Sequence, residues 1–242
     1  MTITATTTAH ASNATSSAAP AGTRVAVSTV IFTLRRAEGQ ERASVALPLV
    51  RRQSDPHEGQ WALPGGWLDI VEDLDAAASR TLAETTGLAP SYLEQLYAFG
   101  AVDRSPTRVV SIVYWALIRP DEIADTSDEN VRWFDADDLP HLAFDHNEIV
   151  SYALWRLRNK VGYSQIAHGL LADEFTLAEL REVYESILRR RLDPANFRRQ
   201  VEGTDTLLPT ERFRKGSHRP ARLYRFNQDV ELADRGPLGV RP

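Results

Sequence analysis

Between residues 24 and 144, apolar segments typical of β-strands alternate with one helical segment. The pattern predicts the helix over Leu74–Thr86, with Gly87 marking its end. The predicted strands, rich in β-branched and aromatic residues, are Val25–Leu34, Ser44–Arg52, Tyr97–Val102, Val109–Ile118 and Val131–Phe134. Strands interleaved with helix predict an α/β domain.

After Leu139 the pattern becomes helical. Asp145 and Glu148 have the spacing of a capping box, and Gly162 marks an end, so a helix is expected between them. This helix is placed as a linker between two domains. The expected division is a disordered tail at 1–23, a first domain at 24–144, the linker helix at 145–162, a second domain at 163–230 and a tail at 231–242.

The second domain opens with a strong helix start, because Thr176 and Glu179 match the capping box. A second short helix follows Asp193–Pro194, since Asp is a good N-cap and Pro is favoured at the first helical position. Two strand-like segments come next, Thr210–Arg214 and Ala221–Phe226. Helix, turn, helix and hairpin in this order predict a winged helix-turn-helix.

The winged part of the chain is basic. Residues 186–226 hold 11 Lys and Arg against 4 Asp and Glu, although the whole chain has a net charge of −5. Asn, Gln and Arg can make paired contacts with base edges, and basic residues neutralise phosphates. The candidate DNA-binding residues are Asn196, Arg198, Arg199, Gln200, Arg214, Lys215, Arg219 and Arg222. A structural helical domain with a basic exposed face is the alternative.

Composition excludes several classes. The chain has no cysteine, so it has no disulfide framework, thiolate metal site or cysteine nucleophile. No stretch approaches the roughly 20 apolar residues of a membrane span. We therefore expect a protein with no membrane association that works in a cytoplasm.

A sharper motif surrounds the first predicted helix. Seven residues keep fixed spacing, namely Gly66, Glu72, Arg80, Leu82, Glu84, Gly87 and Leu88. This register resembles the Nudix box and implies a Nudix fold, a mixed sheet sandwiched between helices. A chance glycine turn before an amphipathic helix is a poor rival.

Two positions depart from the box, because Thr81 and Thr85 stand where the family has glutamates. In active members the carboxylates at positions 81, 84 and 85 share one helical face and hold Mg²⁺ or Mn²⁺ against a pyrophosphate. Only Glu84 remains here as a weak candidate metal ligand. The resemblance therefore implies a degenerate box, no catalytic residues, no required cofactor, and at most weakly held Mg²⁺ with a bound nucleotide.

A degenerate Nudix domain joined to a winged helix resembles the Nudix-related transcriptional regulators of NAD metabolism, the NrtR group. Segments such as Phe144–Asp145–His146 and Asn196–Phe197–Arg198–Arg199 are similar to recurrent segments of that group. The resemblance covers about residues 24–230. It implies a homodimer that represses genes of NAD synthesis or salvage from a palindromic operator. It also implies that ADP-ribose or a related nucleotide releases the DNA.

The candidate ligand-binding residues are four arginines, Arg51, Arg52, Arg104 and Arg108. The first two are adjacent on a strand, so their side chains point to opposite faces and at most one faces the pocket. The other two flank a turn from which they can reach a diphosphate. The alternative for each of the four is an ordinary surface arginine with no role in ligand binding.

Two other functions remain open at this point. An active Nudix pyrophosphohydrolase with an accessory basic domain would release AMP from ADP-ribose with Mg²⁺. An RNA-binding or scaffolding protein would prefer single-stranded RNA, although the sequence offers no aromatic stacking platform.

Overall fold

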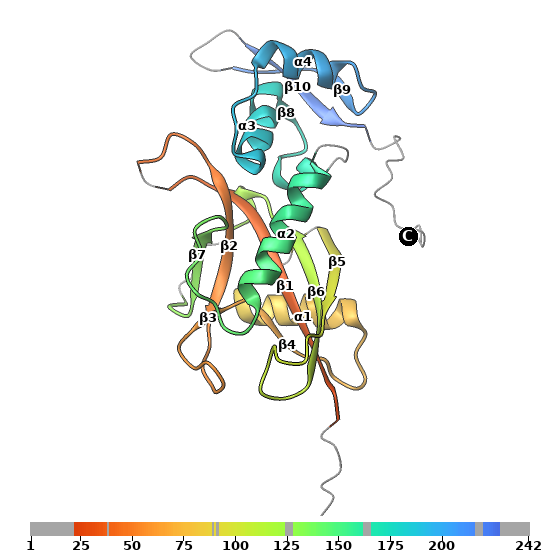
Figure 1. Ribbon diagram of the computed structural model, residues 1–242. Coiled ribbons are helices and arrows are strands. Elements are labelled where there is room, and N and C mark those ends of the chain that lie inside the picture. The colour runs from red at the N-terminus through yellow and green to blue at the C-terminus, as the bar shows by residue number, and fades with distance from the viewer. Residues whose placement is uncertain are drawn as a thin grey trace, which may run out of the picture.

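The computed structural model describes residues 22–37, 39–88, 90, 92–123, 128–161, 166–215 and 220–227. Within them a sheet domain and a smaller winged domain lie at opposite ends of the molecule, joined by helix α2 (Figure 1). The expected tail at 1–23 lies almost entirely outside these residues, as does the tail at 231–242.

A seven-stranded mixed sheet forms the first domain. Its main path is β3-β2-β1-β6-β5, with β4 pairing β1 and β7 pairing β2. The strands are β1 (Arg24–Arg35), β2 (Ser44–Arg51), β3 (Trp61–Ala62), β4 (Gly65–Trp67), β5 (Tyr92–Phe99), β6 (Val109–Leu117) and β7 (Val131–Asp135). The central pair β1 and β6 is parallel, and the other pairs are antiparallel.

Helices cover both faces of this sheet. Side chains alternate along β1, so Val30 and Phe32 join the core beneath α2 (His146–Lys160), whereas Ile31 packs with Leu82 of α1 (Leu74–Thr86). Both sets are fully buried. The expected sandwich of a mixed sheet between helices is confirmed.

The first helix matches its predicted bounds, and Gly87 ends it in the left-handed conformation at φ 70°. The start of α2 differs from the prediction. Asp145 is its N-cap residue, but its side chain makes no capping hydrogen bond. The carboxylate instead pairs with Arg104, 41 residues away, so the expected capping box is wrong.

The winged domain begins with a short 3-10 segment, η2 (Ile166–Leu170). The predicted capping box of α3 (Leu177–Leu188) is confirmed, with Thr176 and Glu179 bonding reciprocally. Asp193 caps α4 (Pro194–Glu202) by accepting from the backbone N–H of Asn196. The wing is a three-stranded sheet in the order β8-β10-β9, made of β8 (Phe175–Thr176), β9 (Leu207–Arg214) and β10 (Ala221–Phe226).

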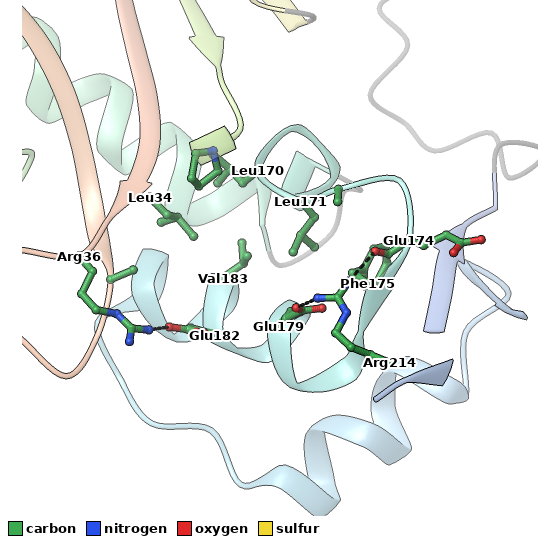
Figure 2. A pocket seen from close by; sticks show the side chains of 13 residues that line it. Leu34, Arg36, Leu170, Leu171, Glu174, Phe175, Glu179, Glu182, Val183 and Arg214 are labelled. Carbon is green, nitrogen blue, oxygen red and sulfur yellow. Dashed lines mark hydrogen bonds and ion pairs between the residues drawn. The ribbon is translucent and has the colours of Figure 1, made fainter. Parts of the chain in front are cut away.

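One of the core clusters extends from the sheet domain into the winged domain. Buried residues of the sheet, of α2, of η2 and of α3 belong to a single cluster. Between the domains this cluster borders a cavity of about 350 Å³ with apolar walls from β1, the η2 region and α3 (Figure 2). Two ion pairs line it, Arg36 with Glu182 and Arg214 with Glu179. The first of them ties the sheet domain to α3.

Two strands are displaced from prediction. The segment expected over Tyr97–Val102 is β5, Tyr92–Phe99, because its register follows β6 and its ladder includes the polar Glu94 and Gln95. Strand β9 begins before Pro209, which an edge strand tolerates. Among the described helices, none has the length and apolar content to cross a bilayer.

Candidate functional site

A pocket with a volume of about 570 Å³ lies in the sheet domain. Its walls come from the start of β1, the loop after β2, β4, the loop before β6 and the start of α2. The cationic and aromatic lining residues are Arg24, Arg52, Trp67, Arg104, Phe144 and His146. The lining includes three arginines but only one carboxylate, that of Asp55, so the pocket suits an anion.

Two of these arginines lie against aromatic rings. The guanidinium of Arg24 lies 3.5 Å from the ring centroid of Trp67, and that of Arg52 lies 4.8 Å from Phe144. Arg52 also donates to the carbonyl of Pro56 at 2.8 Å. These contacts fix flat cationic groups on the pocket wall, where they can meet phosphate oxygens or stack on a base.

The four predicted ligand arginines divide evenly. Arg52 and Arg104 line the pocket, whereas Arg51 and Arg108 are absent from its lining. Arg51 is exposed and donates to the carbonyl of Gly59, and Arg108 donates to the carbonyl of Gly100. Of the adjacent pair, Arg52 alone lines the pocket, which is consistent with the expectation that at most one does.

His146 adds no charge to the pocket. Its Nδ1 accepts the backbone N–H of Leu63 at 2.9 Å, and the side chain is buried. Burial lowers the pKa of His146 to about 4, even though neighbouring Asp145 acts in the opposite direction. The imidazole is therefore neutral near neutral pH, and arginines alone supply the positive potential.

The charged box residues form a cluster between α1, which holds Arg80 and Glu84, and the loop before it, which holds Glu72. Arg80 donates two hydrogen bonds of 2.7 Å to Glu72 and one of 3.1 Å to Glu84. The bonds from Arg80 hold the pKa of Glu72 below its usual value. Thr81 is buried against Gly66, where an added Cβ would lie 2.9 Å from the threonine methyl. Glycine at position 66 thus lets the β4 backbone approach the helix.

The exposed face of α4 presents the predicted base-reading residues. Asn196, Arg199 and Gln200 are exposed, while Phe197 packs inward. Arg199 donates to the Asn196 amide oxygen at 2.8 Å. Arg198 instead pairs with Glu202, which also accepts from Tyr224 of β10. Glu202 therefore links α4 to the wing, and Arg198 holds the Glu202 carboxylate within the helix.

The wing carries the remaining candidates. Arg214 pairs with Glu179, and Arg222 donates to the carbonyl of Thr210 at 2.8 Å. Lys215 is exposed at the end of β9. Arg219 lies outside the residues that the structure describes. The elements that carry these residues, α4, β9 and β10, lie at the opposite end of the molecule from β4, which lines the pocket (Figure 1).

Two family models match the chain. The NUDIX domain covers residues 24–154, and the NrtR DNA-binding winged helix domain covers residues 167–226. The chain is 34% identical over 193 residues to the ADPR responsive transcriptional repressor NtrR of Acinetobacter baylyi, covering 77% of each protein. This chain belongs to the NrtR family.

Further relatives agree with this membership in the NrtR family. The crystal structure of Shewanella oneidensis NrtR complexed with a 27mer DNA is 34% identical, with a TM-score of 0.72, and the match covers 84% of this chain and 93% of that one. An ADP-ribose pyrophosphatase of Methanocaldococcus jannaschii is 35% identical over 111 residues, which are 45% of this chain and 66% of that enzyme. The Nudix fold with a C-terminal winged helix is therefore established.

The polar box side chains of this NrtR-family chain all have partners within the protein. The carboxylates of Glu72 and Glu84 are both bound by Arg80. The hydroxyl of Thr81 donates to the carbonyl of Ala77, and that of Thr85 donates to the carbonyl of Thr81. Within the described residues, no group of three His, Asp or Glu side chains is placed to hold a metal ion.

Sequence reasoning missed Arg24 and Trp67 as pocket residues. They come together because β1 pairs with β4, which places Ala26 opposite Trp67. The available signal in the sequence is that Trp67 directly follows the box glycine Gly66. The contact of Asp145 with Arg104 gave no local signal at all.

Proposed function

We propose that this chain is a transcriptional repressor that binds duplex DNA through its winged helix and responds to ADP-ribose, or a related nucleotide, in its Nudix pocket. It acts in the cytoplasm and controls genes of NAD synthesis or salvage. The relatives named as regulators support this function. So does the division of the molecule into an anion-binding pocket and a basic reading surface.

One observation carries the proposal. A pocket lined by Arg24, Arg52 and Arg104 is joined by a single helix to an NrtR winged domain whose exposed α4 face offers Asn196 and Arg199. The pocket has the volume and charge for a nucleotide diphosphate. The box beside it lacks the carboxylates that hydrolysis requires, so we infer that binding rather than turnover is the domain's role.

Calorimetric titration of ADP-ribose into the full chain tests the pocket. Arg52→Gln is expected to weaken binding about tenfold or more, because a charge-assisted hydrogen bond to phosphate is lost. Arg51→Gln is the matched control, since Arg51 is the exposed neighbour outside the pocket lining. Equal effects of the two substitutions, or no binding by the wild type, would contradict this pocket assignment.

We also propose a homodimer that reads a palindromic operator. One short reading helix gives limited contact, and dimers solve this by pairing half-sites. A surface on β5 and α2 suits self-association. Tyr97 and Trp155 are 56% and 54% exposed, and both rings lie 5.5 Å from that of Tyr152.

Sedimentation at micromolar concentration is expected to show a dimer. Trp155→Ser is expected to shift the chain toward monomer, because it removes exposed aromatic area from this surface. Phe213→Ser is the matched control, since Phe213 is a 53% exposed aromatic of the wing. A wild type that is monomeric both alone and on DNA would overturn the dimer.

A further inference from the structure

The pocket and the linker helix share a segment of chain. Phe144 and His146, on either side of Asp145, both line the pocket, and α2 begins at His146. A ligand that fills the pocket therefore lies against the first turn of α2. The other end of α2 lies beside α3 of the winged domain (Figure 1).

Arg104 holds the start of α2 in place. Its Nε and one terminal nitrogen donate to the two oxygens of Asp145 at 2.8 and 2.6 Å, and its other terminal nitrogen donates to Ser111 at 2.8 Å. The two side chains of the ion pair are only 4% and 14% exposed. Asp145 occupies the N-cap position, yet it gives its carboxylate to Arg104 rather than to the helix N–H groups.

Arg104 is also a pocket residue, so a ligand phosphate meets a guanidinium already bound to a carboxylate. Carboxylate and phosphate oxygens use the same paired geometry on arginine. A diphosphate oriented by Arg24 and Arg52 therefore competes with Asp145 for the donors of Arg104. The carboxylate that loses this competition can cap the helix N–H groups, which favour a negative charge.

The turn before α2 is set in an unusual conformation. Phe144 has φ 56°, in the left-handed region that bulky side chains rarely adopt. Such a conformation persists only when surrounding contacts maintain it. Asp145 directly follows Phe144, so weakening the Arg104–Asp145 pair removes a contact next to this turn.

The far end of α2 is bonded to the winged domain. Arg158 donates its Nε to the carbonyl of Ile187 in α3 at 3.0 Å. Its Nη2 donates to both oxygens of Asp137 at 2.7 and 2.8 Å. A displacement of α2 as a unit therefore reaches α3 through Arg158, and α3 packs against the reading helix α4.

We propose that the bound nucleotide's phosphate competes with Asp145 for Arg104, and that this exchange couples the pocket to the winged domain through α2. The proposal rests on the proposed function, because it assumes that the pocket binds ADP-ribose and that the wing binds DNA. The competition predicts that removing the charge of Asp145 strengthens ADP-ribose binding. If Asp145 only oriented Arg104 for the ligand, removing its charge would weaken ligand binding.

Asp145→Asn in the full chain tests the competition. Asparagine is as good an N-cap as aspartate but makes a weaker, neutral hydrogen bond to Arg104. Calorimetry is expected to show ADP-ribose binding at least about threefold tighter than in the wild type. Asp121→Asn, the same change on an exposed residue, is the control expected to leave affinity unchanged.

The coupling is the ratio of DNA affinities without and with saturating ADP-ribose at fixed salt. This ratio is expected to move toward one in Asp145→Asn. Ligand affinity that is unchanged or weaker, or a ratio equal to that of the wild type, overturns the competition. If the wild type binds neither ADP-ribose nor DNA, the proposed function itself is wrong. This outcome is distinct from a failure of the competition alone.

Arg158→Gln tests the other end of α2 and keeps the proposal falsifiable if the Asp145 variant unfolds. ADP-ribose affinity is expected to be unchanged, because Arg158 is absent from the pocket lining. The coupling ratio is expected to fall at least about threefold, since the bond to Ile187 is lost. Arg156→Gln on the same helix is the control. A wild-type ratio in Arg158→Gln would contradict transmission through α2.

Discussion

Arg199→Ala is expected to weaken binding to the operator by about 1–3 kcal/mol, because the side chain is placed to read a base edge. Arg199 is exposed on α4, beside Asn196 with which it shares a hydrogen bond. The pair offers hydrogen-bond donors and acceptors on the exposed face of α4, whereas Phe197 packs into the core. A mobility shift assay at fixed salt measures the loss.

Arg132→Ala is the matched control, since it removes one exposed positive charge from β7 of the sheet domain.

Arg222→Ala on the wing has a different expected signature. If Arg222 contacts phosphate, all DNA sequences bind the variant more weakly. The slope of log affinity against log salt concentration then falls by about one, because one counterion fewer is released. Should the Arg199 and Arg222 variants both bind like the wild type, the DNA face has been placed wrongly.

The second large effect concerns hydrolysis. We expect wild-type release of AMP from ADP-ribose with Mg²⁺ to lie orders of magnitude below that of active Nudix enzymes. Loss of metal stabilisation costs several kcal/mol in the transition state. Of the three box positions that carry carboxylates in active enzymes, only Glu84 keeps one, and it is paired with Arg80. Chromatography of the reaction products measures the rate.

Thr81→Glu together with Thr85→Glu is expected to strengthen Mg²⁺ binding, measured by calorimetry. The two positions differ in cost, because Thr81 is 2% exposed against Gly66 whereas Thr85 is half-buried. The Thr81 substitution is therefore expected to lower thermal stability more. Wild-type turnover equal to that of ordinary Nudix hydrolases and unaffected by Glu84→Gln would refute the degenerate box.

Local sequence patterns were enough to predict where α3 and α4 start. Thr176 with Glu179, and Asp193 with Pro194, form their caps within a few residues, so sequence spacing was sufficient to place them. The start of α2 was different. Asp145 has an equally good local pattern, but a buried arginine from a distant loop takes its carboxylate. A strong tertiary ion pair overrode the local cap.

The pocket shows the same division. Strand alternation predicted that at most one of Arg51 and Arg52 faces the pocket, but only the pairing of β2 with β3 and β7 settles which. The stacking of Arg24 on Trp67 depends on the register between β1 and β4. Contacts that depend on the register between strands cannot be predicted from the sequence of one segment alone.

The most direct test of the account is a DNA shift assay at one fixed salt concentration. The full chain is mixed with promoter fragments of NAD synthesis and salvage genes, with and without ADP-ribose. We predict specific binding to a palindromic site and a clear loss of DNA affinity when ADP-ribose is added. Binding that shows no sequence preference, or that ADP-ribose leaves unchanged, would contradict the proposed function.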